Sequence, residues 1–302
     1  MRRKIYSFLL LICLLLSCTG CQDTKETEKS NVSSKQNDTQ KEKKSEVRSS
    51  FTTKQSETEE AIEEKEQGTE LTEETETEST QEEPGAIAAS EDTYDYVALG
   101  NSITCNEIEE GLWWGNWGMA ASSEEKDYVH LVSNWLGGQS ARPVTTTVLD
   151  LKKWEVAQKR DDILADYETY FNEHTDLVTI QTGENITDYR DTLTMDYLNL
   201  VDFVKKKAPN ALILMLGETL WPSEDIESAK QAACDYYGVI FVDMTEFLNG
   251  YADSYQSALG TEVSGADGGT YTIGNEVVAA HPNDEGMACI AQQVIDHITV
   301  NN

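Results

Sequence analysis

The carboxyl-terminal part of the chain alternates between short apolar runs and longer segments with helical periodicity. The apolar runs are Tyr94–Leu99, Val144–Leu149, Asp176–Gln181, Ala211–Leu216 and Val239–Val242. The helix-like segments are Tyr128–Leu136, Val156–Phe171, Leu193–Lys207, Glu224–Tyr236 and Glu285–Ile298. Strands that are apolar on both faces and alternate with helices require a mostly parallel sheet that is covered on both sides. The pattern therefore predicts an α/β domain, a three-layer α/β/α sandwich around a mostly parallel five-stranded sheet.

The amino-terminal end of the chain is typical of an exported protein. Met1–Lys4 is cationic, and Ile5–Leu16 is an apolar run with the length of a signal-peptide core, too short to span a bilayer comfortably. A small residue stands directly before Cys18, as in the lipobox of bacterial lipoproteins, and Cys21 is a second candidate for lipidation. Residues 1–21 therefore predict a signal peptide with a lipidation site, and an anchor on the extracellular side of a bacterial membrane. An ordinary secretory signal that happens to contain cysteines is the alternative.

Residues 22–90 have a composition that does not support a folded core. They consist mainly of Glu, Thr, Ser, Lys and Gln, and Phe51 is their only aromatic residue. Such a segment buries too little apolar surface to offset the entropy of ordering, so we expect a disordered acidic tether. A flexible chain of this length would hold the domain at 91–302 on the order of 45 Å from its anchor.

Charge and cysteine content limit the partners of the folded part. The formal charge is −10 for residues 22–90 and −25 for residues 91–302, out of −32 for the whole chain. An acidic surface repels nucleic acid and anionic polymers, so we expect a neutral substrate, no nucleic-acid partner, and membrane contact through the lipid anchor only. Cys105, Cys234 and Cys289 are odd in number and lack metal-type spacing, which argues against a disulfide framework and a zinc site.

Three short motifs fall where predicted strands end or the last helix begins. Gly100-Asn-Ser102 follows the first strand, Gly183-Glu-Asn185 follows the third, and His281-Pro-Asn precedes the last helix. A serine needs a base to become a nucleophile, so Ser102 and His281 are candidates for these two roles. Asn185 can donate a hydrogen bond to an oxyanion that forms next to Ser102. The structural alternatives are a helix cap for Ser102, a polar helix start for His281 and a turn residue for Asn185.

The three motifs in this order resemble those of the SGNH/GDSL family of esterases and acyltransferases. The resemblance covers nearly all of the domain at 91–302 and nothing before it. It implies the flavodoxin-like SGNH hydrolase fold and a serine ester hydrolase that needs no cofactor. It also implies that Ser102 is the nucleophile, His281 the base and Asn185 a donor to the oxyanion.

The chain departs from the family pattern at three places. Val278 stands where the family usually has Asp, three residues before His281. Glu276, Asp267 or a backbone carbonyl are the candidates that could orient the imidazole instead. The segment after the second predicted strand has no glycine, so the second donor to the oxyanion is unassigned. Finally, Asn101 replaces the Asp that commonly precedes the nucleophile.

Tryptophans gather near the predicted site, in the long connection Thr104–Lys126 and after the second strand. They are Trp113, Trp114 and Trp117 in the connection, and Trp154 after the strand. Indole faces stack on sugar rings, so Trp113, Trp114 and Trp154 are predicted to line a carbohydrate-accepting cleft. Packing of at least two of the connection's three indoles in the core is the alternative. A second long connection, Asp243–Ala280, is also expected to border the site.

These features predict a surface-anchored serine esterase that removes acyl groups, with acetyl as the favoured group, from a neutral polysaccharide or glycoside through an acyl-enzyme. A sugar hydroxyl in place of water would make the same site an O-acetyltransferase. Two alternatives belong to other classes. Val278 favours a non-catalytic glycan-binding protein on the same fold, and the anchor and tether also fit a solute-binding lipoprotein.

Overall fold

The computed structural model describes residues 91–300. The predictions for the earlier residues, a signal peptide, lipidation at Cys18 or Cys21 and a tether over residues 22–90, lie outside the described residues and stay predictions.

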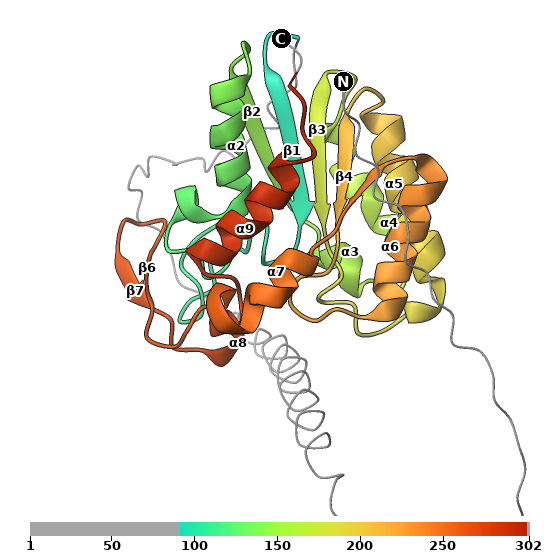
Figure 1. The fold of residues 1–302 in the computed structure, drawn as a ribbon. Helices are drawn as coiled ribbons and strands as arrows, with labels where there is room; N and C mark the ends of the chain where they lie inside the picture. The colour runs from blue at the N-terminus through green and yellow to red at the C-terminus, as the bar shows by residue number, and fades with distance from the viewer. Residues whose placement is uncertain (1–90, 301–302) are drawn as a thin grey trace, which may run out of the picture. The chain divides into compact units, whose positions relative to one another are not determined.

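A five-stranded sheet forms the centre of the domain (Figure 1). Its strands are β1 (Tyr94–Gly100), β2 (Val144–Asp150), β3 (Thr175–Gln181), β4 (Leu212–Leu216) and β5 (Ile240–Val242). They are all parallel and lie in the order β2-β1-β3-β4-β5, which confirms the predicted sheet. The chain runs from β1 to one neighbour, β2, and then to the other, β3. The strand order therefore reverses at β1, the place where ligand sites form in open α/β sheets.

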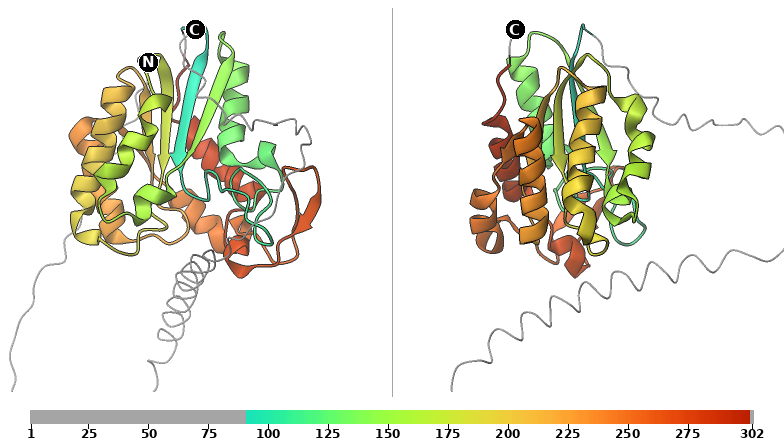
Figure 2. Two further views of the ribbon diagram at one scale, coloured as in Figure 1. Left: turned by 180° about the vertical axis from the view of Figure 1, so that it is seen from behind. Right: turned by 90° about the vertical axis from the view of Figure 1, so that its right-hand side faces the viewer.

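Helices cover both faces of the sheet. They are α2 (Tyr128–Gln139), α3 (Lys152–Val156), α4 (Arg160–Ile163), α5 (Leu193–Lys207), α6 (Glu224–Tyr237), α7 (Thr245–Gly250), α8 (Glu276–Ala279) and α9 (Asp284–Ile295), with 3₁₀ turns at Glu124–Lys126, Leu164–Tyr170 and Arg190–Thr192, and a π-helical turn at Tyr251–Tyr255. The helices α2 and α9 lie on one face, and α5 and α6 on the other (Figure 2). Within residues 91–300, no helix is long and apolar enough to cross a membrane.

Strand β1 shows why the sequence pattern produces this layered arrangement. All seven of its residues are buried. Tyr96 and Ala98 point into the core that contains α2 and α9, whereas Val97 and Leu99 point into the core that contains α5 and α6. Because successive side chains alternate between faces, a strand between two helical layers has to be apolar throughout. The three-layer sandwich predicted from the sequence is confirmed.

Two predicted segments differ from the structure. The single helix predicted at Val156–Phe171 is broken into the end of α3, α4 and a 3₁₀ turn, because Ala157 is extended and ends α3. The break lets the side chain of Arg160 turn into the interior, where it is buried and donates to backbone carbonyls. The predicted loop Asp243–Ala280 contains two short helices and a two-stranded hairpin, β6 (Glu262–Ser264) with β7 (Thr270–Thr272).

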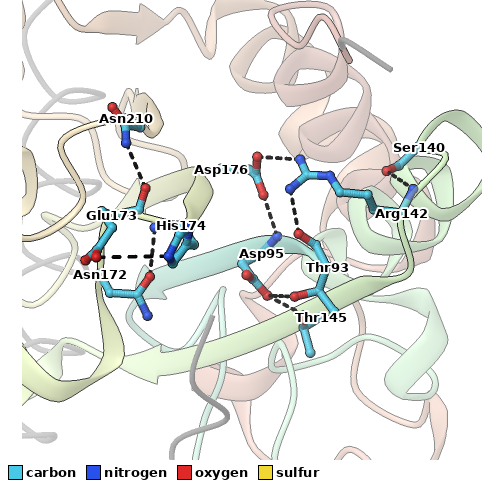
Figure 3. A network of polar contacts seen from close by, with 10 residues as sticks. All are labelled: Thr93, Asp95, Ser140, Arg142, Thr145, Asn172, Glu173, His174, Asp176 and Asn210. Atoms are coloured by element: carbon cyan, nitrogen blue, oxygen red, sulfur yellow. Dashed lines mark hydrogen bonds and ion pairs between the residues drawn. The ribbon is translucent and has the colours of Figure 1, made fainter. Parts of the chain in front are cut away.

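A polar network holds together the amino-terminal ends of β1, β2 and β3 (Figure 3). The guanidinium of Arg142 donates to the carbonyl of Thr93 at 2.7 Å and to the carboxylate of Asp176 at 2.6 Å. The other oxygen of Asp176 accepts from the backbone N–H of Asp95 at 2.9 Å. These contacts fix the edge of the sheet that lies opposite the carboxyl ends, where the motif residues gather.

Candidate active site

Ser102 stands in a tight turn directly after β1. The N–H groups of Thr104 and Cys105 donate to the carbonyl of Asn101 at 2.8 and 2.9 Å, which closes the turn. A Cβ atom at Gly100 would lie 1.9 Å from Oγ1 of Thr104 and 2.7 Å from the carbonyl oxygen of Gln181, so only glycine fits there. The side chain of Ser102 is partly exposed, so the turn presents the hydroxyl where a substrate can reach it.

His281 lies against this hydroxyl, although it comes from the connection between α8 and α9. Its Nε2 is 2.7 Å from Oγ of Ser102, and 179 positions separate the two residues in the sequence. The backbone of His281 is fixed on both sides, because its carbonyl accepts from the N–H of Ser257 at 2.9 Å and its N–H donates to the carbonyl of Val278 at 2.9 Å. The structure therefore brings the two predicted residues into direct contact.

A backbone carbonyl orients the imidazole. Nδ1 of His281 lies 2.8 Å from the carbonyl oxygen of Val277. A carbonyl can only accept, so Nδ1 carries the hydrogen and Nε2 is left as the acceptor for the hydroxyl of Ser102. Of the three orienting groups that the sequence left open, this is the backbone carbonyl. Asp267 instead accepts from the hydroxyl of Tyr271 and the N–H of Gly269.

Burial keeps the imidazole neutral. The residue is only 3 % exposed, and this desolvation lowers the pKa of His281 to about 4, although the Val277 carbonyl acts in the opposite direction. At neutral pH the ring is therefore unprotonated and can accept a proton. Val278, which replaces the expected Asp, is buried in the apolar core and makes no polar contact with the ring through its side chain.

Asn185 lies beside the nucleophile turn at the same edge of the sheet. Gly100 pairs with Gln181 across β1 and β3, so the turns that carry Ser102 and Asn185 begin at the same level of the sheet. The turn between the end of β3 and Asn185 needs Gly183. The φ angle of Gly183 is 130°, and a Cβ atom there would lie 2.9 Å from a carboxyl oxygen of Glu218. The amide of Asn185 is half-buried and donates to Glu155 at 2.5 Å, which leaves its second N–H for another acceptor.

Two buried carboxylates, Glu155 and Glu184, connect the motif residues, and neither was predicted as a site residue from the sequence. Glu155 accepts from Asn185, Asn101, Thr182 and the N–H of Gly183. Glu184 accepts from the amide of Asn101 at 2.7 Å, the amide of Gln181 at 2.8 Å, and the N–H and hydroxyl of Thr219 at 3.0 and 2.8 Å. The one signal for Glu155 was an acidic residue directly next to Trp154 in the segment that follows the second strand.

The pKa values of the buried acids shift in different directions because their surroundings differ. Burial and the nearby charge of Glu184 raise the pKa of Glu155. Burial would also raise the pKa of Glu184, but the ammonium of Lys230 and the hydrogen bonds from Thr219 lower it below its ordinary value. Burial, with a contribution from Glu184, raises the pKa of Glu218 to about 8, so this third acid is largely neutral at pH 7. Across residues 91–300, no group of three His, Cys, Asp or Glu side chains is arranged to hold a metal ion.

The predicted tryptophan wall is wrong for two of its three members. Trp113 and Trp154 are completely buried, so neither can present a face to a sugar. Each packs edge to face on an aromatic neighbour, Trp113 on Trp117 at 6.0 Å and Trp154 on Tyr197 at 5.3 Å between ring centroids. Both belong to the cores on either side of the sheet, where large aromatic side chains bury the most apolar surface.

Trp114 differs from the other two because it is only partly buried. Its ring stacks on that of Tyr271 in β7, with centroids 4.6 Å apart and planes within 8°. The carbonyl of Trp114 also accepts from the N–H of Ala266 at 2.8 Å. The first long connection and the β6–β7 hairpin therefore hold each other in place.

A serine hydroxyl in contact with a neutral imidazole, at the carboxyl edge of a parallel α/β sheet, is the type of site that serine hydrolases use. No family model matches the chain, and no curated protein sequence matches it.

Among solved structures, the chain is similar to an extracellular lipase from Streptomyces rimosus (16 % identity, 68 % of this chain and 100 % of the lipase, TM-score 0.45). It is also similar to phospholipase A1 from Streptomyces albidoflavus NA297 (15 % identity, 68 % and 99 %, TM-score 0.44). A third neighbour is a two-domain esterase active on acetylated mannans (16 % identity, 68 % and 48 %, TM-score 0.41). At these TM-scores the similarities carry no weight for the function, which has to be judged from the site's own geometry.

Proposed function

We propose that the chain is an SGNH/GDSL-type serine ester hydrolase. The observation that carries the proposal is the 2.7 Å contact between Oγ of Ser102 and Nε2 of His281, with the tautomer of the ring fixed by the carbonyl of Val277. In this tautomer the ring can take the proton of the hydroxyl as Ser102 attacks an ester carbonyl. The protonated ring then returns the proton to the leaving alcohol, and an acyl-enzyme remains on Ser102. Water, activated by the same ring, releases the acid.

Two groups are available to stabilise the oxyanion in this mechanism. No described residue accepts a hydrogen bond from the N–H of Ser102, and the second N–H of Asn185 is also available. In the segment after β2, the N–H groups of Leu151 and Lys152 are not available as donors, because that of Leu151 donates to the carbonyl of Gly100 and that of Lys152 to the side chain of Asp150. Each donor in such a hole contributes about 3 kcal/mol to the barrier lowering, so the loss of either one should be costly.

The substrate we propose is an acetylated neutral polysaccharide or glycoside, reached from a lipid anchor on the extracellular side of the membrane. The acidic charge of the domain disfavours polyanionic substrates. The partly buried Trp114 on Tyr271 offers an aromatic surface of the kind that sugar rings stack on. If a sugar hydroxyl replaces water in the last step, the product is an O-acetylated sugar instead of free acetate.

A fluorophosphonate probe, which reacts with activated serines, tests the nucleophile directly. Wild-type protein should be labelled and should hydrolyse p-nitrophenyl acetate, and Ser102→Ala should do neither. Ser228→Ala is the matched control, because Ser228 is exposed on α6 and should leave both activities unchanged. An unlabelled wild-type protein that still binds glycan would instead support the non-catalytic binding protein. Mass spectrometry of sugar oligomers incubated with an acetyl donor would separate transfer from hydrolysis.

A further inference from the structure

The carboxylate of Glu155 joins the two turns that form the proposed oxyanion site. Glu155 lies in α3, directly after β2, and is completely buried. Its Oε2 accepts from the amide of Asn185 at 2.5 Å. Its Oε1 accepts from the hydroxyl of Thr182 at 2.9 Å, the amide of Asn101 at 3.0 Å and the N–H of Gly183. One side chain therefore receives hydrogen bonds from both the nucleophile turn and the turn that carries Asn185.

We propose that Glu155 is a positioning residue that fixes the amide of Asn185 so that its second N–H is presented to the oxyanion. The proposal rests on the proposed function, because it assigns a task within that reaction. It also accounts for the missing glycine after β2, since this segment acts on the oxyanion through a side chain instead of a backbone N–H.

The chemistry of the two groups makes the orientation unique. A carboxylate only accepts hydrogen bonds, whereas the end of an asparagine side chain has one donor group and one acceptor oxygen. Only the NH₂ group of Asn185 can face Glu155, so the amide cannot turn its oxygen toward the carboxylate without repulsion. The four groups around Glu155 donate to it, which favours the ionised form against the effects of burial and of the charge of Glu184. Such charge-assisted bonds are the stronger ones. The amide is therefore held before substrate arrives, which is the condition for effective stabilisation of an oxyanion.

Asn101 fits the same scheme and explains another departure from the family pattern. Its amide donates to both carboxylates, to Glu155 at 3.0 Å and to Glu184 at 2.7 Å. Its side-chain oxygen accepts from the N–H of Ile103 in the nucleophile turn. An Asp at this position would place a third carboxylate between two others. The change from Asp to Asn beside the nucleophile therefore goes together with the presence of Glu155 and Glu184.

A double-mutant cycle tests whether Glu155 acts through Asn185. Glu155→Gln keeps the shape of the side chain, but its NH₂ group would face the donors that now bond to the carboxylate. We expect kcat for p-nitrophenyl acetate to fall about 10- to 100-fold with little change in KM, somewhat less than the loss of a whole donor. In the Asn185→Ala background the same substitution should cost less than about threefold, because the group it positions is gone. If the fold-loss of kcat in the double variant equals the product of the losses in the two single variants, the proposal is wrong.

Two controls separate positioning from folding. Asp176→Asn removes a carboxylate that accepts from Arg142 and from the N–H of Asp95 at the opposite edge of the sheet. It should lower the melting temperature and leave kcat unchanged. Glu155→Asp keeps the charge on a shorter side chain and should recover part of the kcat lost in Glu155→Gln. If kcat in every variant simply follows the melting temperature, the role of Glu155 is structural and the proposal is wrong.

A readout without turnover distinguishes this proposal from the proposed function. The side-chain amide signal of Asn185 in the ¹H–¹⁵N spectrum of the full chain is identified by its loss in Asn185→Ala. One of its protons should lie downfield because of the bond to Glu155, and it should move upfield in Glu155→Gln. An unchanged signal would overturn the proposal. If the signal moves but wild-type protein shows neither labelling nor hydrolysis, the contact is real and the proposed function has failed.

Discussion

The carbonyl of Val277 accepts a hydrogen bond from Nδ1 of His281 at 2.8 Å, in the position where a triad would have a carboxylate. A neutral dipole fixes the tautomer as well as a carboxylate does, but it stabilises the imidazolium less. Burial lowers the pKa of His281 to about 4, and the bond to the Val277 carbonyl offsets this only in part.

The pH profile of kcat/KM should therefore extend unusually far into acid. The base has to be neutral, so activity should rise with pH through about 4, the pKa of His281, and be flat above pH 6. The measurement is kcat/KM for a p-nitrophenyl ester from pH 3.5 to 8, with tryptophan fluorescence at each pH to show that the domain stays folded. A half-maximum near 6.5 would mean that the ring is not desolvated as the structure has it.

Restoring the family's carboxylate should not help this chain. Val278→Asp places an acid where the valine is completely buried in the apolar core. We expect the variant to lose at least about 2 kcal/mol of unfolding free energy and to show no gain in kcat. Val278→Ala, which creates a cavity without a charge, is the comparison. A rise in kcat for the Asp variant would show that a side chain at 278 can reach the imidazole.

Asn101→Asp should destabilise the domain in a pH-dependent way. The new carboxyl would face Glu155 and Glu184, so its folded pKa would be raised above the unfolded value of about 3.9. A group with a raised folded pKa makes a contribution to the free energy of unfolding that is present below about pH 4 and is lost as the pH increases. Urea unfolding should show a deficit of about 3 kcal/mol or more at pH 8 and a smaller one at pH 5. Asn101→Ala, which adds no charge, should show a deficit that hardly changes between these two pH values.

Glu218→Gln should make the domain more tolerant of alkaline pH. The folded pKa of Glu218 is about 8, above its ordinary value of 4.5, so its contribution to stability is lost as the pH rises through 8. The neutral amide has no such titration. Between pH 5 and 9 the melting temperature of wild-type protein should therefore fall several degrees further than that of the variant. Parallel curves would mean that Glu218 is ionised in the folded state.

The proposed lipid anchor can also be tested. Growth with a radiolabelled fatty acid should label the wild-type protein. Cys18→Ala should abolish the label if Cys18 is the lipidated residue, whereas Cys21→Ala should leave it intact. The opposite result would assign the lipid to Cys21. If neither the wild-type protein nor either variant is labelled, the result favours an ordinary secretory signal.

Most of the fold could be predicted from the sequence because burial controls the pattern directly. A strand between two helical layers has to be apolar on both faces, and α5 begins and ends at the predicted residues Leu193 and Lys207. The break after α3 could not be predicted, because it depends on where the buried Arg160 finds its carbonyl partners. The burial of Trp113 and Trp117 was one of two alternatives that the sequence left open, since composition does not distinguish an indole in a wall from one in a core.

Only the part of the site that consists of side chains in short motifs could be predicted from the sequence. Ser102, Asn185 and His281 stand in short motifs, and the structure places Ser102 and His281 in contact. Glu155 was missed because acidic residues are rarely buried, and nothing local shows that four donors surround it. A backbone carbonyl was one of the candidates for orienting the imidazole. The sequence could not show that it belongs to Val277, since every residue has a carbonyl.

The main-chain partner of the imidazole has a consequence for mutagenesis. Alanine scanning deletes side chains and leaves every peptide oxygen in place, so a complete scan of the domain would not remove the group that aligns His281. Such an experiment would reveal Ser102 and His281 as a dyad and would miss the carbonyl that orients the imidazole. Disabling that carbonyl requires a change in the path of the polypeptide around α8, for example through the cap that Asn275 provides to the N–H of Val277.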